Sequence, residues 1–168
     1  MPRIQGTEQR KRNAVNLRPV EPADLDWFFE HQQDSEANIM AGFTAKNPSD
    51  RGVFDHHWSS MLADPDVTVR TIEHDGRVVG SVMAYPNDGY QEISFWTDKA
   101  YWSRGVTTSA VDAFLAEFAE RPIRARVVTD NIGSQKVLER RGFQIVGEAE
   151  GFANARAAVV KEYIMELS

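Results

Sequence analysis

The stretch YWSRGVTTSAVDAFLAEF, residues 101–118, joins a short polar turn directly to an amphipathic helix. A helix N-terminus leaves unpaired N–H groups and a partial positive charge, which together attract anions. Gly105 would let the backbone approach a phosphate closely, and Arg104 would add charge. Thr107 and Thr108 would add hydroxyl donors. The alternative is that one threonine only caps the helix while Arg104 points into water.

The rest of the chain alternates between strand-like and helical patterns, without internal repeats. Asp75-Gly76 between two apolar runs predicts a two-residue β-hairpin turn, because such turns need positive φ. Gly142 is placed to end a helix in the left-handed conformation. The order β-α-α-β-β-β-α-β-α-β-β predicts a mixed α/β domain with a central twisted sheet. The predicted elements are strand 16–20, helical regions 21–39 and 49–64, strands 67–74, 77–85 and 90–98, a helix ending before Arg121-Pro122, strand 123–129, helix 130–141, and strands 143–152 and 156–167.

Composition excludes several classes of protein. Of 168 residues, 42% are hydrophobic and 26% charged, which is typical of a globular domain. There is no cysteine, and the four histidines lack metal-ligand spacing, so we expect neither a disulfide framework nor a zinc site. No apolar run is long enough for a membrane helix, and the first residues lack a signal-peptide core. These features predict a cytoplasmic protein without a bound metal.

Charge is unevenly distributed along the chain. Residues 1–18 carry five basic groups and one acidic group, a net +4, whereas the whole chain carries −6, so the remainder carries −10. We interpret residues 1–15 as a basic N-terminal arm and residues 16–168 as a single domain. A basic arm can touch nucleic acid, but one short cluster on an acidic body is more often solvated.

Two segments resemble the GNAT superfamily of acetyl-CoA-dependent N-acetyltransferases. They are EISFWTDKAYWSRGVTTSAV, residues 92–111, and DNIGSQKVLERRGF, residues 130–143. Together with the element order, the resemblance covers residues 16–167 and is strongest to the RimJ/RimL-like branch. It implies a mostly antiparallel twisted sheet of six to seven strands flanked by about four helices. It also implies acetyl-CoA as co-substrate, an amine as acceptor, and a monomer or homodimer.

The resemblance assigns cofactor contacts to three segments. The strand before the turn would offer backbone groups to the pantetheine arm and the thioester carbonyl, although its aromatic side chains can equally be ordinary core or surface residues. The turn and helix start would bind the pyrophosphate. Asn131 would reach the pantetheine, unless it only caps its helix, and Lys136 would meet a phosphate, unless it is simply solvated. The expected cofactor-binding residues are Phe95, Trp96, Thr97, Ser103, Arg104, Gly105, Val106, Thr107, Thr108, Asn131 and Lys136.

The same resemblance guides the assignment of proton-transfer groups. The family often places a tyrosine, as acid for the departing thiolate, where this chain has Leu138. Ser134 is our candidate to take that role. Amine acetylation also needs a base, because an ammonium cannot attack a thioester. Glu92 is the best-placed carboxylate, with a surface glutamate as its alternative interpretation.

The acceptor pocket is expected among the helices of residues 22–63. One of His31, His56 and His57 could serve there as the base, although His57 beside Trp58 is expected in the core. The predicted pocket residues are Trp27, Phe28, Phe43, His57 and Trp58. The sequence thus predicts an N-acetyltransferase acting by direct attack of a bound amine. The alternative is a non-catalytic module that binds or senses acyl-CoA, favoured by Leu138 at the tyrosine position.

Overall fold

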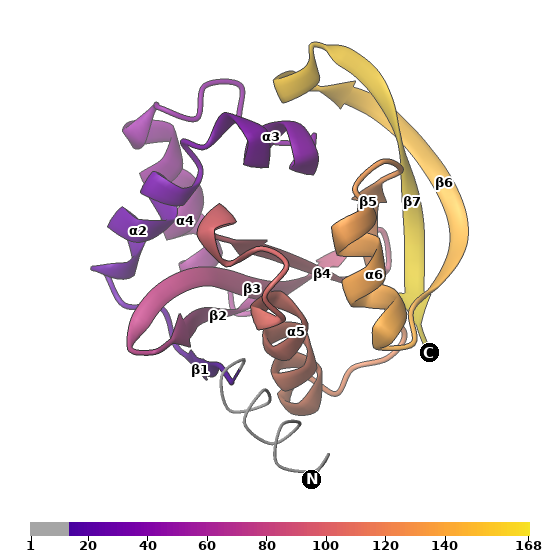
Figure 1. Cartoon of the computed structure of the whole chain (residues 1–168), viewed down its shortest axis with the longest axis horizontal. Coiled ribbons are helices and arrows are strands. Elements are labelled where there is room, and N and C mark those ends of the chain that lie inside the picture. Colours follow the sequence, from indigo (N-terminus) through magenta and orange to yellow (C-terminus); the bar gives the residue numbers. More distant parts are fainter. Residues whose placement is uncertain (1–13) are drawn as a thin grey trace, which may run out of the picture.

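The computed structural model describes residues 14–168 (Figure 1). The predicted basic arm, residues 1–15, falls almost entirely outside the described residues. Among these, no helix is both long and apolar enough to cross a membrane. The elements are β1 (Asn16–Arg18), α2 (Asp24–His31), α3 (Ser35–Ala41), α4 (Arg51–Ala63), β2 (Thr68–His74), β3 (Arg77–Asn87), β4 (Tyr90–Thr97), η1 (Lys99–Tyr101), α5 (Val106–Glu117), β5 (Ile123–Val128), α6 (Ile132–Arg140), β6 (Gln144–Ala153), η2 (Asn154–Arg156) and β7 (Ala158–Leu167).

Seven strands form one sheet in the order β1-β2-β3-β4-β5-β7-β6. All neighbouring strands run antiparallel except β4 and β5, which are parallel. A parallel neighbour needs a crossover connection, and α5 provides it. The predicted fold class, a mixed α/β fold with a mostly antiparallel sheet, is confirmed.

Two tight turns connect the central strands. Asp75 and Gly76 have φ of 50° and 73°, the positive values that a two-residue hairpin turn of type I′ requires, as predicted. Asp88 and Gly89 repeat this conformation, with φ of 53° and 80°. The sequence predicted a turn over residues 86–89, but β3 continues through Asn87 and only Asp88 and Gly89 form the turn.

The helical region predicted over residues 21–39 is two helices rather than one. Asp34 has extended backbone, with ψ of 116°, and its side chain accepts a hydrogen bond from the N–H of Ala37. This N-cap starts α3 in a new direction after α2 has ended at His31. The described residues therefore contain five α-helices, where the sequence analysis expected about four.

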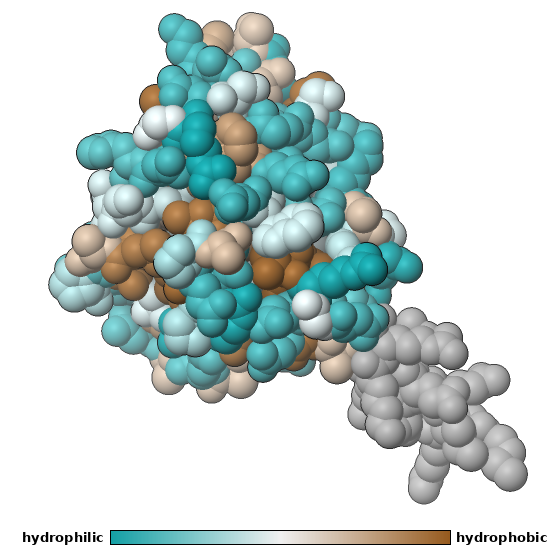
Figure 2. All heavy atoms as spheres, turned by 90° about the vertical axis from the view of Figure 1, so that its left-hand side faces the viewer, coloured by the Kyte–Doolittle hydropathy of each residue, from teal (hydrophilic) through white to brown (hydrophobic). Residues whose placement is uncertain are grey.

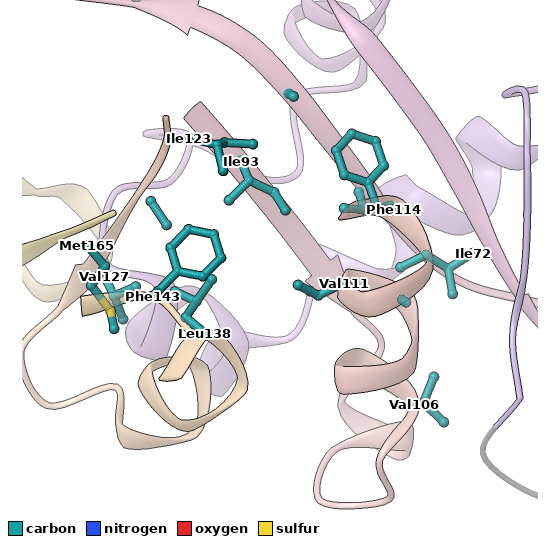
Figure 3. Close-up of a cluster of buried hydrophobic side chains, with 14 of the residues drawn as sticks. Ile72, Ile93, Val106, Val111, Phe114, Ile123, Val127, Leu138, Phe143 and Met165 are labelled. Atoms are coloured by element: carbon teal, nitrogen blue, oxygen red, sulfur yellow. The ribbon is translucent and has the colours of Figure 1, made fainter. Parts of the chain in front are cut away.

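The main core lies between the sheet and the helices α5 and α6. In Figure 3, Val111 and Phe114 of α5 and Leu138 of α6 point toward the strand residues Ile93 and Ile123. All five side chains are buried. The predicted apolar stripe of α5 is thus the surface that fixes the helix, and with it the turn at its amino end.

A smaller core holds α2 and α4 against β2 and β3. It contains Phe28, Phe54, Trp58 and Val69, and the rings of Phe28 and Trp58 stack with centroids 4.9 Å apart. Beside this core, the buried carboxylate of Asp24 accepts hydrogen bonds from Arg18, Thr71 and the backbone N–H of Glu21. Burial alone would raise the pKa of Asp24, but these hydrogen bonds outweigh it and lower the pKa.

Candidate functional site

A cavity of about 600 Å³ lies where four elements meet: α3, the carboxyl end of β4, the turn before α5, and the first turns of α6. Most of the residues with predicted cofactor contacts come together around it. Its lining residues are Ala37, Met40, Ala41, Phe95, Trp96, Thr97, Trp102, Ser103, Gly105, Thr107, Thr108, Asp130, Asn131, Ile132, Gly133, Ser134, Lys136, Val137 and Arg140.

The amino end of α5 borders the cavity with free backbone donors. Its N-cap is Gly105, in the left-handed conformation with φ of 78°, and no side chain caps the helix. The interpretation that a threonine only caps the helix is therefore wrong. The N–H groups of Val106, Thr107 and Thr108 have no acceptor within the helix, because the first turn of any helix leaves its N–H groups unpaired. This arrangement suits an anion such as a phosphate.

Two hydrogen bonds fasten the turn to the end of β4. The indole N–H of Trp102 donates to the carbonyl of Thr97 at 2.9 Å. The hydroxyl of Thr107 donates to the hydroxyl of Thr97, also at 2.9 Å. These contacts link the turn before α5 to the carboxyl end of β4.

Two residues of the predicted loop set do not contribute side chains to the cavity. Val106 is fully buried in the main core, so only its backbone can face a ligand. Arg104 lies over the ring of Tyr101, with 5.6 Å from its guanidinium carbon to the ring centroid, and is exposed. This exposed position agrees with the alternative interpretation, in which Arg104 points into water.

The carboxyl half of β4 has a free edge on the side of β5. The two strands pair only at Gln91 with Ile123 and Glu92 with Arg124, and they diverge beyond that point. Since Asp98 donates its N–H to Val79 of β3, strand alternation turns the N–H groups of Phe95 and Thr97 away from β3, toward the gap. The β3–β4 register is continuous through this segment, so β4 carries no bulge against β3.

Helix α6 adds polar groups on the opposite side of the cavity. Asn131 is its N-cap and accepts a hydrogen bond from the N–H of Ser134 at 3.3 Å. The cap interpretation of Asn131 therefore holds, and its side chain still borders the cavity. The Ser134 hydroxyl also borders it and makes no hydrogen bond to the described part of the chain.

Two cations stand one turn apart on the cavity side of α6. Lys136 was predicted as a phosphate contact; Arg140 was missed, although its spacing from Lys136 puts it on the same helix face. Among residues 14–168, neither has a carboxylate within ion-pair distance. Both are exposed, so their charges are available to an anionic ligand.

The position expected for a catalytic tyrosine is a core position in this chain. Leu138 is fully buried in the main core (Figure 3), and its side chain does not line the cavity. A hydroxyl near the site must come from elsewhere, and Ser134 supplies one.

Glu92 lies at the centre of a hydrogen-bonded cluster on β3, β4 and β5. Its buried carboxylate accepts hydrogen bonds from the Tyr85 hydroxyl at 2.5 Å, the Asn87 amide at 3.2 Å and the Arg126 guanidinium at 3.2 Å. Arg126 also donates to Glu162, at 3.3 Å. Glu92 does not border the cavity, but strand alternation places it on the same sheet face as Trp96, which does.

The partners of Glu92 were not predicted from the sequence. Burial, with the hydrogen bond to Glu92 in addition, raises the pKa of Tyr85 well above its usual value, so Tyr85 remains a donor at neutral pH. Burial lowers the pKa of Arg126, but Glu162 and Glu92 outweigh it and the pKa is raised. Tyr85 could have been found from the hairpin register, because the two-residue turn puts it directly opposite Glu92.

None of the five residues predicted for the acceptor pocket borders this cavity. Phe28 and Trp58 are buried in the smaller core, whereas Trp27 and Phe43 are 52% and 43% exposed. His57 is exposed, so its expected place in the core is wrong; the buried positions of α4 are Phe54 and Trp58. Figure 2 shows that apolar side chains on the side of α2, α3 and α4 lie scattered within a mainly hydrophilic surface.

The three candidate histidines differ in exposure. His56 and His57 are exposed on α4. His31 is buried at the end of α2, with its Nε2 3.7 Å from a carboxylate oxygen of Asp98. Burial lowers the pKa of His31, and the attraction of Asp98 and Glu30 reverses only part of this shift. None of the three borders the cavity.

Comparison with protein families identifies the class. The model for the acetyltransferase (GNAT) domain matches residues 14–144. The match covers most of the chain, so the protein belongs to the GNAT acetyltransferase family, whose members use acetyl-CoA. None of the curated protein sequences compared with the chain matches it.

Solved structures support the same fold. RimJ from Mycobacterium smegmatis, in complex with CoA-disulfide, is 19% identical with a TM-score of 0.76, over 93% of this chain and 83% of that one. A spermidine N-acetyltransferase from Vibrio cholerae, in complex with CoA and spermine, is 15% identical with a TM-score of 0.77, over 91% and 94%. A ribosomal-protein-alanine N-acetyltransferase from Brucella melitensis is 17% identical with a TM-score of 0.74, over 90% and 98%.

The cavity fits acetyl-CoA in its chemistry. The free N–H groups of α5 and the two cations of α6 suit phosphates, and the free edge of β4 can pair with the amide groups of pantetheine. Trp96 also borders the cavity, although its indole N–H is buried and has no hydrogen-bond partner within the described residues. Donors therefore surround the cavity on several sides.

Proposed function

We propose that the protein is an N-acetyltransferase of the RimJ/RimL-like branch, which transfers an acetyl group to a primary amine with both substrates bound. The observation that carries the proposal is the juxtaposition of the turn at Gly105 with the N–H groups of Phe95 and Thr97, which face the gap between β4 and β5. The first suits a pyrophosphate, and the second suits the arm that ends in the thioester.

Acetyl-CoA, when bound, supplies an acetyl group activated as a thioester. The backbone N–H groups of Val106, Thr107 and Thr108 would hold its pyrophosphate, with Lys136 and Arg140 near its phosphates. The N–H groups of Phe95 and Thr97 would donate to carbonyl oxygens of the arm and, at the thioester, stabilise developing negative charge. Ser134 would donate a hydrogen bond to sulfur.

Glu92 is the proposed general base for the amine. An ammonium has no lone pair, so a base must accept its proton before attack. The three hydrogen-bond donors to Glu92 hold its carboxylate in one orientation. Trp96 borders the cavity and lies four residues along β4 from Glu92, so the rise of a strand separates their Cα atoms by about 13 Å. We therefore expect the proton to reach Glu92 through water rather than by direct contact.

Phe43 is the predicted pocket residue best placed to contact an acceptor. It is partly exposed and packs against Gly151 of β6, on the face of the hairpin that also carries Glu162. The acidic partners Glu92 and Glu162 favour a cationic acceptor over an anionic one. Trp27 and His57 remain candidates for the rim of the proposed acceptor pocket.

The proposal is tested by CoA release with four classes of amine: peptide N-termini, aminoglycosides, polyamines and amino acids. At least one class should release CoA and yield an N-acetylated product by mass spectrometry, while the matching alcohols should not. Glu92→Gln should lower kcat by about 100-fold and leave the acetyl-CoA Kd unchanged. Glu148→Gln, which changes an exposed glutamate of β6, is the control and should behave as wild type.

Tight acetyl-CoA binding without turnover of any amine would instead support a module that only binds acyl-CoA. Turnover with an unchanged kcat and pH profile in Glu92→Gln would keep the enzyme assignment and remove Glu92 as the base.

A further inference from the structure

Helix α3 forms one wall of the cavity but is held there by little apolar burial. Its buried residues are Ala37 and Asn38, and Ile39 is 47% exposed. Neither hydrophobic core includes a residue of α3. Since stabilisation by burial scales with apolar area, α3 depends on polar contacts for its position.

Arg156, in the turn between β6 and β7, supplies one of these polar contacts and links it to Asp130, just before α6. Its Nε donates to the carbonyl of Ile39 at 2.7 Å. Its Nη1 and Nη2 donate to the two carboxylate oxygens of Asp130, at 2.5 and 2.7 Å. Ile39 is in the last turn of α3, where carbonyls lack intrahelical partners, so the guanidinium acts as a cap. Asp130 lies just before α6 and borders the cavity.

One side chain therefore joins the two facing walls of the cavity. Met40 and Ala41 line the wall next to Ile39, and Asn131 lines the wall next to Asp130. At the other end of α3, Lys99 pairs with Glu36. The carboxyl end has a second tie from the same turn, because the amide of Asn154 donates to the carbonyl of Thr44 at 2.9 Å.

We propose that Arg156 is a positioning residue that sets the separation of α3 from α6 and thereby the affinity of the cavity for acetyl-CoA. This inference rests on the proposed function, in which that cavity holds acetyl-CoA. Arg156 acts through the backbone of Ile39 and the carboxylate of Asp130 rather than by touching the ligand.

The contacts of Arg156 should matter more for the cavity than for global stability. The Asp130 side chain is 63% exposed, although that of Arg156 is only 17% exposed, and ion pairs that reach the surface stabilise a fold by only about 0–1 kcal/mol. A cavity wall is more sensitive, because a small displacement of α3 changes every contact made by its lining residues. Arginine is also specific here, since one lysine ammonium cannot reproduce the paired contacts to Asp130 together with the Ile39 contact.

The test compares acetyl-CoA binding by calorimetry across a set of variants of the full chain. Arg156→Ala should raise the Kd by roughly threefold to tenfold, and Arg156→Lys should raise it less. The control is Arg70→Ala, which breaks an exposed ion pair to Glu117 on another part of the surface and should leave the Kd unchanged. The two alanine variants should have similar unfolding free energies.

A charge effect must be separated from a positioning effect. Arg156→Ala alone leaves the Asp130 carboxylate unpaired beside an anionic ligand, which would itself weaken binding. The double variant Arg156→Ala with Asp130→Asn restores the net charge but not the link to Ile39. We expect it to stay weaker than wild type; binding at the wild-type Kd would overturn the proposal.

The result also distinguishes failure of this inference from failure of the proposed function. If substitution of Gly105 leaves the acetyl-CoA Kd at its wild-type value, the cavity is not the acetyl-CoA site and the proposed function fails there. If Gly105 matters and Arg156→Ala binds as Arg70→Ala does, the site stands and the positioning role is refuted.

Discussion

Helices α5 and α6 and helices α2, α3 and α4 flank the same sheet, yet they differ in how their functional residues are encoded. Around α5 and α6, residues predicted from sequence, from Phe95 to Lys136, meet at one cavity. Around α2 and α4, the aromatic residues predicted as a pocket divide between core and surface. The predicted cofactor site depends largely on backbone groups, whereas the predicted acceptor pocket depended on side chains alone.

This difference indicates that a site made of backbone groups is easier to predict from sequence than one made of side chains. A glycine with φ of 78° before an apolar helix stripe fixes the direction of free N–H groups, whatever side chains surround it. An aromatic residue on a helix points to core or solvent according to a rotation of about 100° per residue. Trp27 and Phe28 are neighbours in sequence with opposite outcomes.

The largest expected effect comes from Trp58. Trp58→Ala removes a buried ring stacked on Phe28, so it should lower the free energy of unfolding by about 3–5 kcal/mol. The matched control Trp27→Ala removes an exposed ring and should cost less than about 1 kcal/mol. Urea unfolding measures both.

If Trp58 is structural only, the folded Trp58→Ala protein keeps the wild-type acetyl-CoA Kd and the wild-type ranking of amine acceptors. A changed ranking would show that the smaller core takes part in acceptor selection, and the contrast between the two helical regions would weaken.

An intermediate effect is expected at Gly105. Gly105→Ala introduces a side chain at positive φ in the turn that would hold the pyrophosphate, so the acetyl-CoA Kd should rise by about tenfold. Gly89→Ala is the matched control. Gly89 has nearly the same φ, 80°, in a hairpin turn where an added Cβ meets no atom within 4 Å.

The two glycine variants share the backbone strain and differ in location. Calorimetry with acetyl-CoA should therefore separate them, while their unfolding free energies should be similar. Equal Kd values in both would mean that the turn at Gly105 does not bind the cofactor.

The sequence predicted the fold through features that act locally. The first hairpin turn, the left-handed Gly142 and the apolar stripe of α5 all agree with the structure. The split of residues 21–39 was missed because the Asp34 cap competes with a helical pattern that continues past it. The N-cap preference of Asp34 decided the boundary between α2 and α3, and the spacing of apolar residues did not show it.

The long-range contacts of the site could not be predicted in the same way. Arg126 meets Glu92 across the only parallel strand pair in the described sheet, 34 positions along the chain. Arg156 meets Ile39 from 117 positions away. Such contacts depend on strand order and on the curvature of β6 and β7, which carries the turn between them toward α3 (Figure 1). No periodicity encodes them.

The smallest expected effect concerns His31, which joins the two regions by facing Asp98 at the start of η1. Its folded-state pKa is lowered, so the unfolded chain binds this proton more readily than the folded one. The free energy of unfolding should then fall as the pH drops below the ordinary histidine value of about 6.5, by at most about 1.4 kcal/mol per pH unit from one group. His31→Gln should remove that part of the slope between pH 7 and 5, as measured by urea unfolding. The exposed His56→Gln is the control and should keep the wild-type slope. If the two variants have the same slope, protonation of His31 does not contribute to the pH dependence of stability.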